Sequence, residues 1–383
     1  MLVLRWFSGL TGGVIVAFTW LSMINSLIVP RRTPSLLQKL VGRANRKFFS
    51  WVAGLFDDYM KKDRVLAYFG PAGLLLLLFT WQSLFFAGYS LMVWAVAGGS
   101  FGDAMRETGS SMLTLGIAAR PGAGPHIVYF SAGATGLAAV ALLIAYLPTL
   151  YGAFSRRETL VTMLQSRAGA PAWGPEILAR HRMVSLHDDL PSFYGRWEEW
   201  SADVAESHTT YPILIFFRAP HPLRSWIVGL LSVLDSAALY LALCPDRAPT
   251  QARLCLRMGF TCLREVADAI GLDYDPDPLP DDPIELTFEE FRASLARLDD
   301  VGFAMDRSPE EAWPHFRGWR VNYEAIAYAI CDAVVAPPGP WSGERTHLPG
   351  MAIVPRRPPN RQPDEPAEAA EPKSDRQTWR LRG

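Results

Sequence analysis

Long apolar stretches alternate with charged segments in the first half of the chain. Residues 6–30, 65–102 and 121–155 contain no Asp, Glu, Lys or Arg. A helix crosses the bilayer core, about 30 Å thick, with about 20 apolar residues, so each stretch is long enough to span it. A single soluble domain is therefore excluded. The pattern predicts three transmembrane helices, at residues 1–30, 65–96 and 127–151.

The second half of the chain has a helical pattern. Between residues 158 and 336, apolar positions recur at the helical period in five segments: 196–217, 225–243, 250–270, 288–305 and 309–335. No GxGxxG motif follows a strand and no Walker loop occurs, so a nucleotide-binding domain is not expected. We therefore predict an all-α fold, in which membrane helices are followed by a helical domain at residues 158–336.

One apolar segment of this domain allows two interpretations. Residues 226–244 are apolar except for Asp235 and a few Ser, so they could form a fourth span. An Asp at the centre of a span costs roughly 2.5 to 3.5 kcal/mol on insertion scales, and Arg residues flank both ends of the segment. We therefore favour a buried cytosolic helix, in which Asp235 needs a partner such as Arg253 or Arg257.

Composition and the remaining motifs exclude several classes of function. Half of the residues are hydrophobic and the formal net charge is −1, which excludes a basic nucleic-acid-binding protein and a wholly disordered chain. The four cysteines lack metal-ligand spacing, and the histidines form no HExxH motif. We expect no catalytic residue, metal, cofactor or small-molecule substrate, and hence no enzyme. Ten prolines in residues 337–383 predict a disordered tail.

Basic residues predict the orientation in the membrane. Residues 31–64 contain nine Lys or Arg against three Asp, whereas residues 98–125 contain only Arg106 and Arg120. The positive-inside rule then places residues 31–64 in the cytoplasm and residues 98–125 outside. We expect a multi-pass protein of the cell (inner) membrane, with its N-terminus outside and the domain at 158–336 in the cytoplasm.

The basic connection at residues 31–64 contains an amphipathic segment. Aromatic and aliphatic residues recur at helical spacing between Phe48 and Tyr59, and basic residues flank them. This pattern indicates an interfacial helix, with rings at the headgroup level and basic side chains on anionic lipid. The alternative is a helix packed beneath the protein. Membrane lipid is thus one expected partner.

The connection between the second and third spans contains a short helical pattern. Gly98 and Gly99 end the second span, and apolar residues then recur at roughly helical spacing from Phe101 to Leu115. This segment is too short and too polar to cross a membrane. Irregular backbone is tolerated at membrane depth where it is buried in protein or lines water. We therefore expect a re-entrant helix and loop over residues 101–118.

The order of these elements over residues 65–157 resembles the pore module of bacterial potassium-channel-like membrane proteins. In that family, a Thr-x-Gly-aromatic-Gly strip offers backbone carbonyls to the ion. The resemblance implies that Thr114, Leu115 and Gly116 form the inner half of such a strip. Ile117 and Ala118 stand where the family has the aromatic residue and the second Gly. The resemblance continues downstream, without assigning chemistry, at Glu206, Ser207, His208, Tyr211, Pro212, Ser225, Trp226 and Asp235.

The third span contains residues that weaken a helix. Gly133 and Gly136 lower helix stability locally, and Pro148 removes a backbone hydrogen bond. A gating hinge at these residues is one interpretation. Close packing of small residues against another helix is the other.

A single re-entrant segment cannot enclose an axis, so a pore would need about four chains around it. We therefore expect a homotetrameric channel for a monovalent cation, which the resemblance identifies as potassium. Ala resists the positive φ that Gly adopts freely, so Ala118 argues against the family's potassium selectivity. The alternative function is a non-conducting membrane receptor or scaffold that retains the pore-loop fold.

Overall fold

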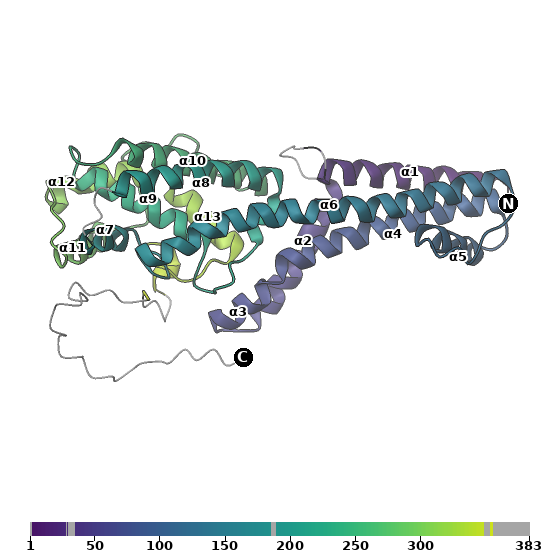
Figure 1. Cartoon of the computed structure of the whole chain (residues 1–383), viewed down its shortest axis with the longest axis horizontal. Coiled ribbons are helices and arrows are strands. Elements are labelled where there is room, and N and C mark those ends of the chain that lie inside the picture. Colours follow the sequence, from purple (N-terminus) through teal and green to yellow (C-terminus); the bar gives the residue numbers. More distant parts are fainter. Residues whose placement is uncertain (1, 28, 30–34, 185–188, 348–352, 355–383) are drawn as a thin grey trace.

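The computed structural model describes residues 2–27, 29, 35–184, 189–347 and 353–354. Within these residues the regular elements are helices, and the one β-bridge joins Ala170 to Val354. The molecule is elongated, with a group of apolar helices at one end and a compact helical domain at the other (Figure 1). The N-terminus lies at the end farthest from the helical domain.

Among the described residues, four helical stretches are long and apolar enough to cross a membrane, which indicates a membrane protein. They contain α1 (Leu2–Leu27), α4 (Phe69–Ala97), α6 (Ala123–Ala168) and α9 (Trp226–Leu243). Three of them, α1, α4 and α6, expose many large apolar side chains. Helix α9 differs because other helices of the domain enclose it along its whole length apart from Tyr240.

Helix α6 connects the two ends of the molecule. It has 46 residues, so at 1.5 Å per residue it is about 70 Å long, more than twice the thickness of a bilayer core. The sequence analysis ends this span at residue 151 because charged residues begin shortly afterwards. In the structure the helix continues past Pro148 and past Arg157 into the helical domain (Figure 1).

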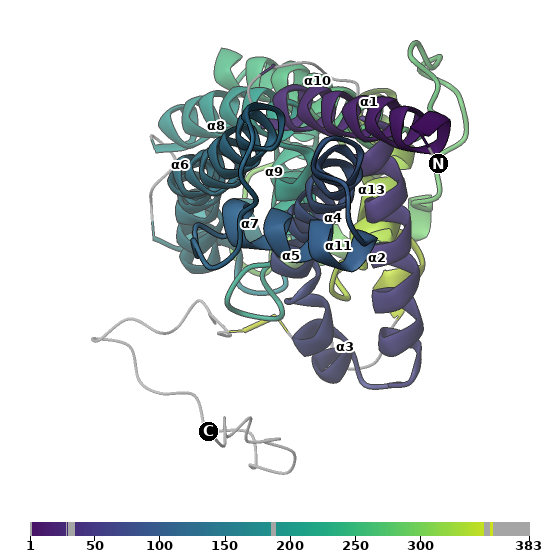
Figure 2. The same ribbon diagram turned by 90° about the vertical axis from the view of Figure 1, so that its right-hand side faces the viewer.

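Helices α1 and α4 pack closely along their length. A Cβ atom added at Gly12 would lie 2.4 Å from the carbonyl oxygen of Gly88, so the two glycines allow the backbones to approach. Helix α5 (Phe101–Met112) packs on the other side of α4 and also contacts α6 (Figure 2).

The basic connection folds into α2 (Leu36–Gly54) and α3 (Tyr59–Leu66). One face of α2 packs on the start of α4, where the Asn45 side chain donates a hydrogen bond to the Phe69 carbonyl at 3.0 Å. The opposite face leaves large apolar side chains exposed, and these are Leu36, Leu40, Phe48 and Trp51. The buried face fits the packed alternative, and the interfacial interpretation stays a prediction. The segment expected as one helix from Phe48 to Tyr59 is interrupted, because α2 ends at Gly54 and α3 begins at Tyr59.

The helical domain is built around α9. The surrounding elements are α7 (Gly174–Met183), α8 (Leu190–Thr210), η2 (Pro212–Phe216), α10 (Thr250–Ile270), α11 (Phe288–Asp299), α12 (Pro309–Arg320) and α13 (Glu324–Val334). The segment 309–335, expected as one helix, is two helices because a turn at residues 321–323 separates them. The segment 196–217 is likewise divided, because α8 ends at Thr210 and the 3₁₀ turn η2 begins at Pro212.

The domain extends beyond the boundary that the sequence analysis places at residue 336. Trp341 is buried beside Trp173 and Phe316, and η3 (Gly343–His347) follows it. Residues 337–347, expected as part of a disordered tail, therefore belong to the domain, because the first prolines after residue 336 precede the buried Trp341. The rest of the expected tail, residues 355–383, lies outside the described residues.

Asp235 has a different partner from the two arginines that the sequence analysis names. Its carboxylate pairs with the fully buried Arg320 guanidinium and accepts a hydrogen bond from Tyr323 at 2.8 Å. Arg253 and Arg257 are exposed because they lie on the outer face of α10. Burial raises the pKa of Asp235 to about 6, and Arg320 and Tyr323 limit that rise.

Candidate functional site

Helix α5 and the loop after it form the candidate site. Ser100 caps the start of α5 by accepting a hydrogen bond from the Asp103 amide at 3.1 Å. One face of the helix is buried against α4 and α6, and it includes Ala104, Thr108 and Met112. The segment is shorter than a span and packs against both α4 and α6, and its re-entry into a membrane stays a prediction.

The end of α5 lies deep along α6. A Cβ atom added at Gly136 would lie 2.2 Å from the Met112 carbonyl oxygen, and one at Gly133 would lie 3.2 Å from that of Ser111. Gly136 is 13 residues after Ala123, the first residue of α6, so the end of α5 lies about 20 Å along that helix. The loop at residues 113–122 then returns to the start of α6.

The backbone turns sharply after α5. Thr114 has φ 57° and Gly116 has φ 67°, both in the left-handed region. The amides of Leu115 and Gly116 donate to the Ser110 carbonyl at 2.8 and 3.3 Å, and the Thr114 amide donates to Ser111 at 3.0 Å. Left-handed residues commonly end helices in this way, although Gly is usual and Thr is not.

These bonds fix the direction of the loop carbonyls. In a trans peptide the N–H and C=O groups point in opposite directions. Because the amides of residues 114–116 point to the end of α5, the carbonyls of Leu113, Thr114 and Leu115 point away from it. The Ile117 carbonyl is turned the same way, since the Ala118 amide donates to the Ser110 hydroxyl at 2.9 Å. No donor among the described residues reaches these four carbonyls.

Two large apolar side chains of this loop are exposed on the surface of the single chain. Leu115 is 57% exposed and Ile117 is 75% exposed. Positive φ occurs at Thr114 and Gly116 but not at Ile117 or Ala118. The sequence differs from the family's strip at Ile117 and Ala118. The backbone changes at the same place, because these two residues lack the positive φ of Thr114 and Gly116.

A cluster of polar side chains around the buried Glu107 carboxylate holds the returning loop. The Arg120 guanidinium pairs with Glu107 of α5 at 2.7 Å and with Asp103 at 2.9 Å. It also donates to the Gly98 carbonyl at 2.8 Å, and the Tyr129 hydroxyl of α6 donates to Glu107 at 2.6 Å. Ionisable groups among membrane helices are rare and usually functional. Here they tie the loop to α4, α5 and α6.

The sequence analysis does not assign a role to Glu107 or Tyr129. The available signal is the position of Glu107, which shares a face of α5 with Ala104 and Thr108. A lone carboxylate on a buried face needs a cation. Which cation it takes depends on the return of the loop, and the pattern of residues does not determine that.

We expect the Arg120→Gln variant to be less stable because it leaves the Glu107 carboxylate buried without a cation. The loss should be about 2 to 3 kcal/mol, below the usual range for a buried pair since Arg120 is 29% exposed. Thermal unfolding of the purified protein in detergent, followed by tryptophan fluorescence, measures this. Arg106→Gln is the matched control, as Arg106 is largely exposed. Equal effects of both changes would contradict the role of Arg120.

The three hinge candidates lie within the continuous helix α6. Gly133 and Gly136 face the end of α5, so the structure gives them a packing role. Pro148 lies farther along α6, toward the helical domain. A bend at any of the three stays a prediction.

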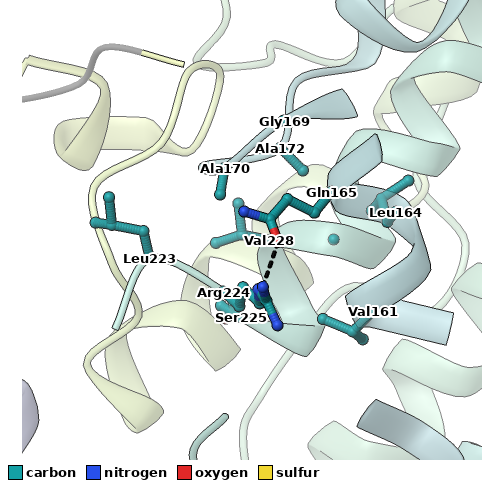
Figure 3. A pocket seen from close by; sticks show the side chains of 11 residues that line it. Val161, Leu164, Gln165, Gly169, Ala170, Ala172, Leu223, Arg224, Ser225 and Val228 are labelled. Atoms are coloured by element: carbon teal, nitrogen blue, oxygen red, sulfur yellow. Dashed lines mark hydrogen bonds between the residues drawn. The ribbon is translucent and has the colours of Figure 1, made fainter. Parts of the chain in front are cut away.

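The helical domain contains a small cavity between α6 and the start of α9. Val161, Leu164, Arg224 and Val228 are among the residues that line it, and Arg224 donates a hydrogen bond to Gln165 at its edge (Figure 3). Its volume of about 10 Å³ corresponds to about one water molecule, so this cavity cannot hold a small-molecule ligand. Comparisons with protein-family models, curated proteins and solved structures find no match for the chain.

Proposed function

We propose that the protein is the subunit of a homotetrameric ion channel. The loop carbonyls of Leu113, Thr114, Leu115 and Ile117 from four copies would line the ion path. The observation that carries this proposal is the direction of these carbonyls, which point away from the end of a helix placed deep between α4 and α6. Carbonyl oxygens so arranged can replace the hydration shell of a monovalent cation. Potassium is the proposed ion because the loop resembles the inner half of a potassium-channel strip.

Assembly of four copies is part of the proposal because one loop surrounds nothing. Large apolar side chains on the loop and on α6 are exposed in the single chain, and they include Leu115, Ile117, Phe130, Leu137 and Ile144. Neighbouring copies and lipid would cover them in a membrane. The expected orientation places the N-terminus and α5 outside the cell and the helical domain in the cytoplasm, where the basic helix α2 meets anionic lipid.

A second candidate function is a non-conducting receptor or scaffold. Two observations support it. The positive φ values of the loop stop at Gly116, and Ala118 stands where a potassium-selective strip needs a further Gly. A receptor of this kind could keep α5 and the Glu107–Arg120 pair for assembly alone. Conduction distinguishes the two functions.

We expect purified protein in a planar bilayer to pass current, with a reversal potential that favours potassium when potassium and sodium are on opposite sides. Gly116→Ala should remove this current and leave assembly intact. The added Cβ has open space, but φ 67° is costly for Ala, by about 1 to 2 kcal/mol. Gly13→Ala in α1 is the matched control, because its Cβ also meets open space without a positive φ.

Two outcomes would reject the channel. One is a correctly assembled wild-type tetramer that carries no current in any monovalent salt. The other is a current that Gly116→Ala leaves unchanged in both size and selectivity. Either result would favour the receptor or scaffold.

A further inference from the structure

A short segment between α8 and α9 touches both the membrane helices and the helical domain. We call residues 211–218, which contain η2, the junction segment. Its Phe217 ring lies against α4 at Gly70, where an added Cβ would be 2.5 Å from the ring. Its Phe216 ring packs on Phe69 of α4 with centroids 5.0 Å apart, and the Arg46 guanidinium of α2 lies 5.3 Å from the same ring.

One guanidinium fastens the junction segment to α6. Arg157 of α6 is fully buried and donates to the carbonyls of Leu214 and Phe217 at 2.7 and 2.6 Å. It also pairs with Glu158 at 2.8 Å. Movement of the segment relative to α6 would leave a buried cation without these acceptors, which is costly.

Residues that the sequence analysis singles out without a role meet at Arg157. The His208 ring of α8 lies 3.0 Å from the Arg157 guanidinium, and the Trp226 ring of α9 lies 5.6 Å from it. Burial, reinforced by the charge of Arg157, lowers the pKa of His208 well below its usual value. The neutral ring can therefore accept a hydrogen bond from Arg157 through Nε2. These contacts join α6 to two helices of the domain.

A second guanidinium fastens the junction segment to α3 and to the end of the domain. Arg218 pairs with Asp63 of α3 at 2.6 Å and donates to the Tyr59 hydroxyl at 2.6 Å. It also donates to the carbonyls of Val334 and Val335, at the end of α13, at 2.7 and 2.9 Å. Val335 has φ 52°, a conformation that a β-branched residue rarely adopts.

We propose that the junction segment is a mechanical link that transmits conformational changes of the helical domain to α4 and α6 together. In the channel this link would set the fraction of time the pore is open, and that consequence rests on the proposed function. The two guanidiniums and the aromatic contacts hold one segment to five helices. Separation of α4 from α6 there would break either the aromatic contacts to α4 or the buried hydrogen bonds of Arg157. Such closely packed contacts favour discrete arrangements over gradual deformation.

The test uses Gly70→Ala, which displaces the Phe217 ring, and Arg218→Gln, which releases α3. Gly42→Ala in α2 is the control because its Cβ meets no atom within 4 Å. In single-channel recordings, both test variants should change the open probability at least about fivefold, the lower end of couplings between sites, and leave the unitary conductance unchanged. The control should change neither quantity. Normal open probability in both test variants would overturn the proposal.

A second measurement does not depend on conduction, so failure of the link and failure of the channel can be separated. Asp235→Asn perturbs the domain core at Arg320 and Tyr323, outside the junction segment. Hydrogen exchange then reports on residues 59–73 and 146–157 in detergent-solubilised full-length protein. We expect faster exchange in both ranges for Asp235→Asn, and less acceleration when Gly70→Ala is also present. Exchange rates in these ranges that are unchanged by Asp235→Asn would overturn the link, even if the protein carries no current.

Discussion

Replacing Arg320 by Met should lower the unfolding temperature of the helical domain by about 10 °C, which corresponds to about 3 to 5 kcal/mol. Arg320 is fully buried and neutralises two buried carboxylates, those of Asp235 and Glu324. It also donates to the Tyr328 hydroxyl and the Trp341 carbonyl at 2.7 and 2.8 Å. The Met side chain fills similar space but leaves both carboxylates without a cation.

The loss should depend on pH. The pKa of Asp235 in the folded protein is already raised to about 6, and it should rise further without Arg320. A carboxyl with a raised folded pKa stabilises the fold when it is protonated, and that contribution is lost as pH rises through the folded pKa. Arg320→Met should therefore be more destabilising at pH 8 than at pH 5. Tryptophan fluorescence during thermal unfolding measures both values.

Asp235→Asn is the matched comparison for Arg320→Met, because it leaves Arg320 paired with Glu324. Its loss should be about 1 to 2 kcal/mol. Equal losses for the two variants would show that the charge balance at Arg320 is not what stabilises this core. A loss for Arg320→Met that does not vary between pH 5 and pH 8 would contradict the role of Asp235 protonation.

The positions of the long apolar helices could be predicted because they depend on composition over long windows. A stretch free of charge is either in lipid or enclosed by protein, and three such stretches precede the helical domain. Helix α9 shows where this signal becomes ambiguous, since its residues are as apolar as those of a span. Asp235 favours a helix enclosed by protein over a span. In the structure α9 is enclosed, and Asp235 pairs with Arg320, which lies 85 positions away in the sequence.

The polar contacts of the site could not be predicted in the same way. Glu107 and Arg120 meet because the loop returns beside α5, and Arg157 meets His208 because α6 continues into the domain. Each pair joins residues on different elements, and the sequence contains several equally suitable partners for each. Local patterns predict the elements, whereas the pairing follows from how they pack.

The same limit applies to Gly133 and Gly136. Hinge and packing residues have the same sequence signature, because both need a small side chain in an apolar helix. The structure separates their packing roles by distance, with Gly136 much closer to the backbone of α5 than Gly133. This difference provides a direct test of what positions the loop.

We expect Gly136→Ala to displace the end of α5 and abolish any current, whereas Gly133→Ala should be tolerated. The Cβ at residue 136 would lie 2.2 Å from the Met112 carbonyl oxygen, a backbone atom that cannot rotate away, and 3.0 Å from Met112 Cγ. Overpacking of this kind costs about 1 to 3 kcal/mol. The Cβ at residue 133 would be 3.2 Å from the nearest atom, so a shift of a few tenths of an ångström accommodates it.

Hydrogen exchange over residues 101–120 and native mass spectrometry measure the two effects of Gly136→Ala. Exchange should accelerate and the proposed tetramer should weaken, because Thr114 and Gly116 follow directly from the displaced end of α5. Gly133→Ala changes the same residue type on the same helix, so it controls for lost backbone flexibility. If a hinge at these glycines mattered more than packing, both variants would impair gating and neither would alter exchange in α5. If close packing positions the loop, only Gly136→Ala alters exchange. The loss of current then follows from the displacement of the loop.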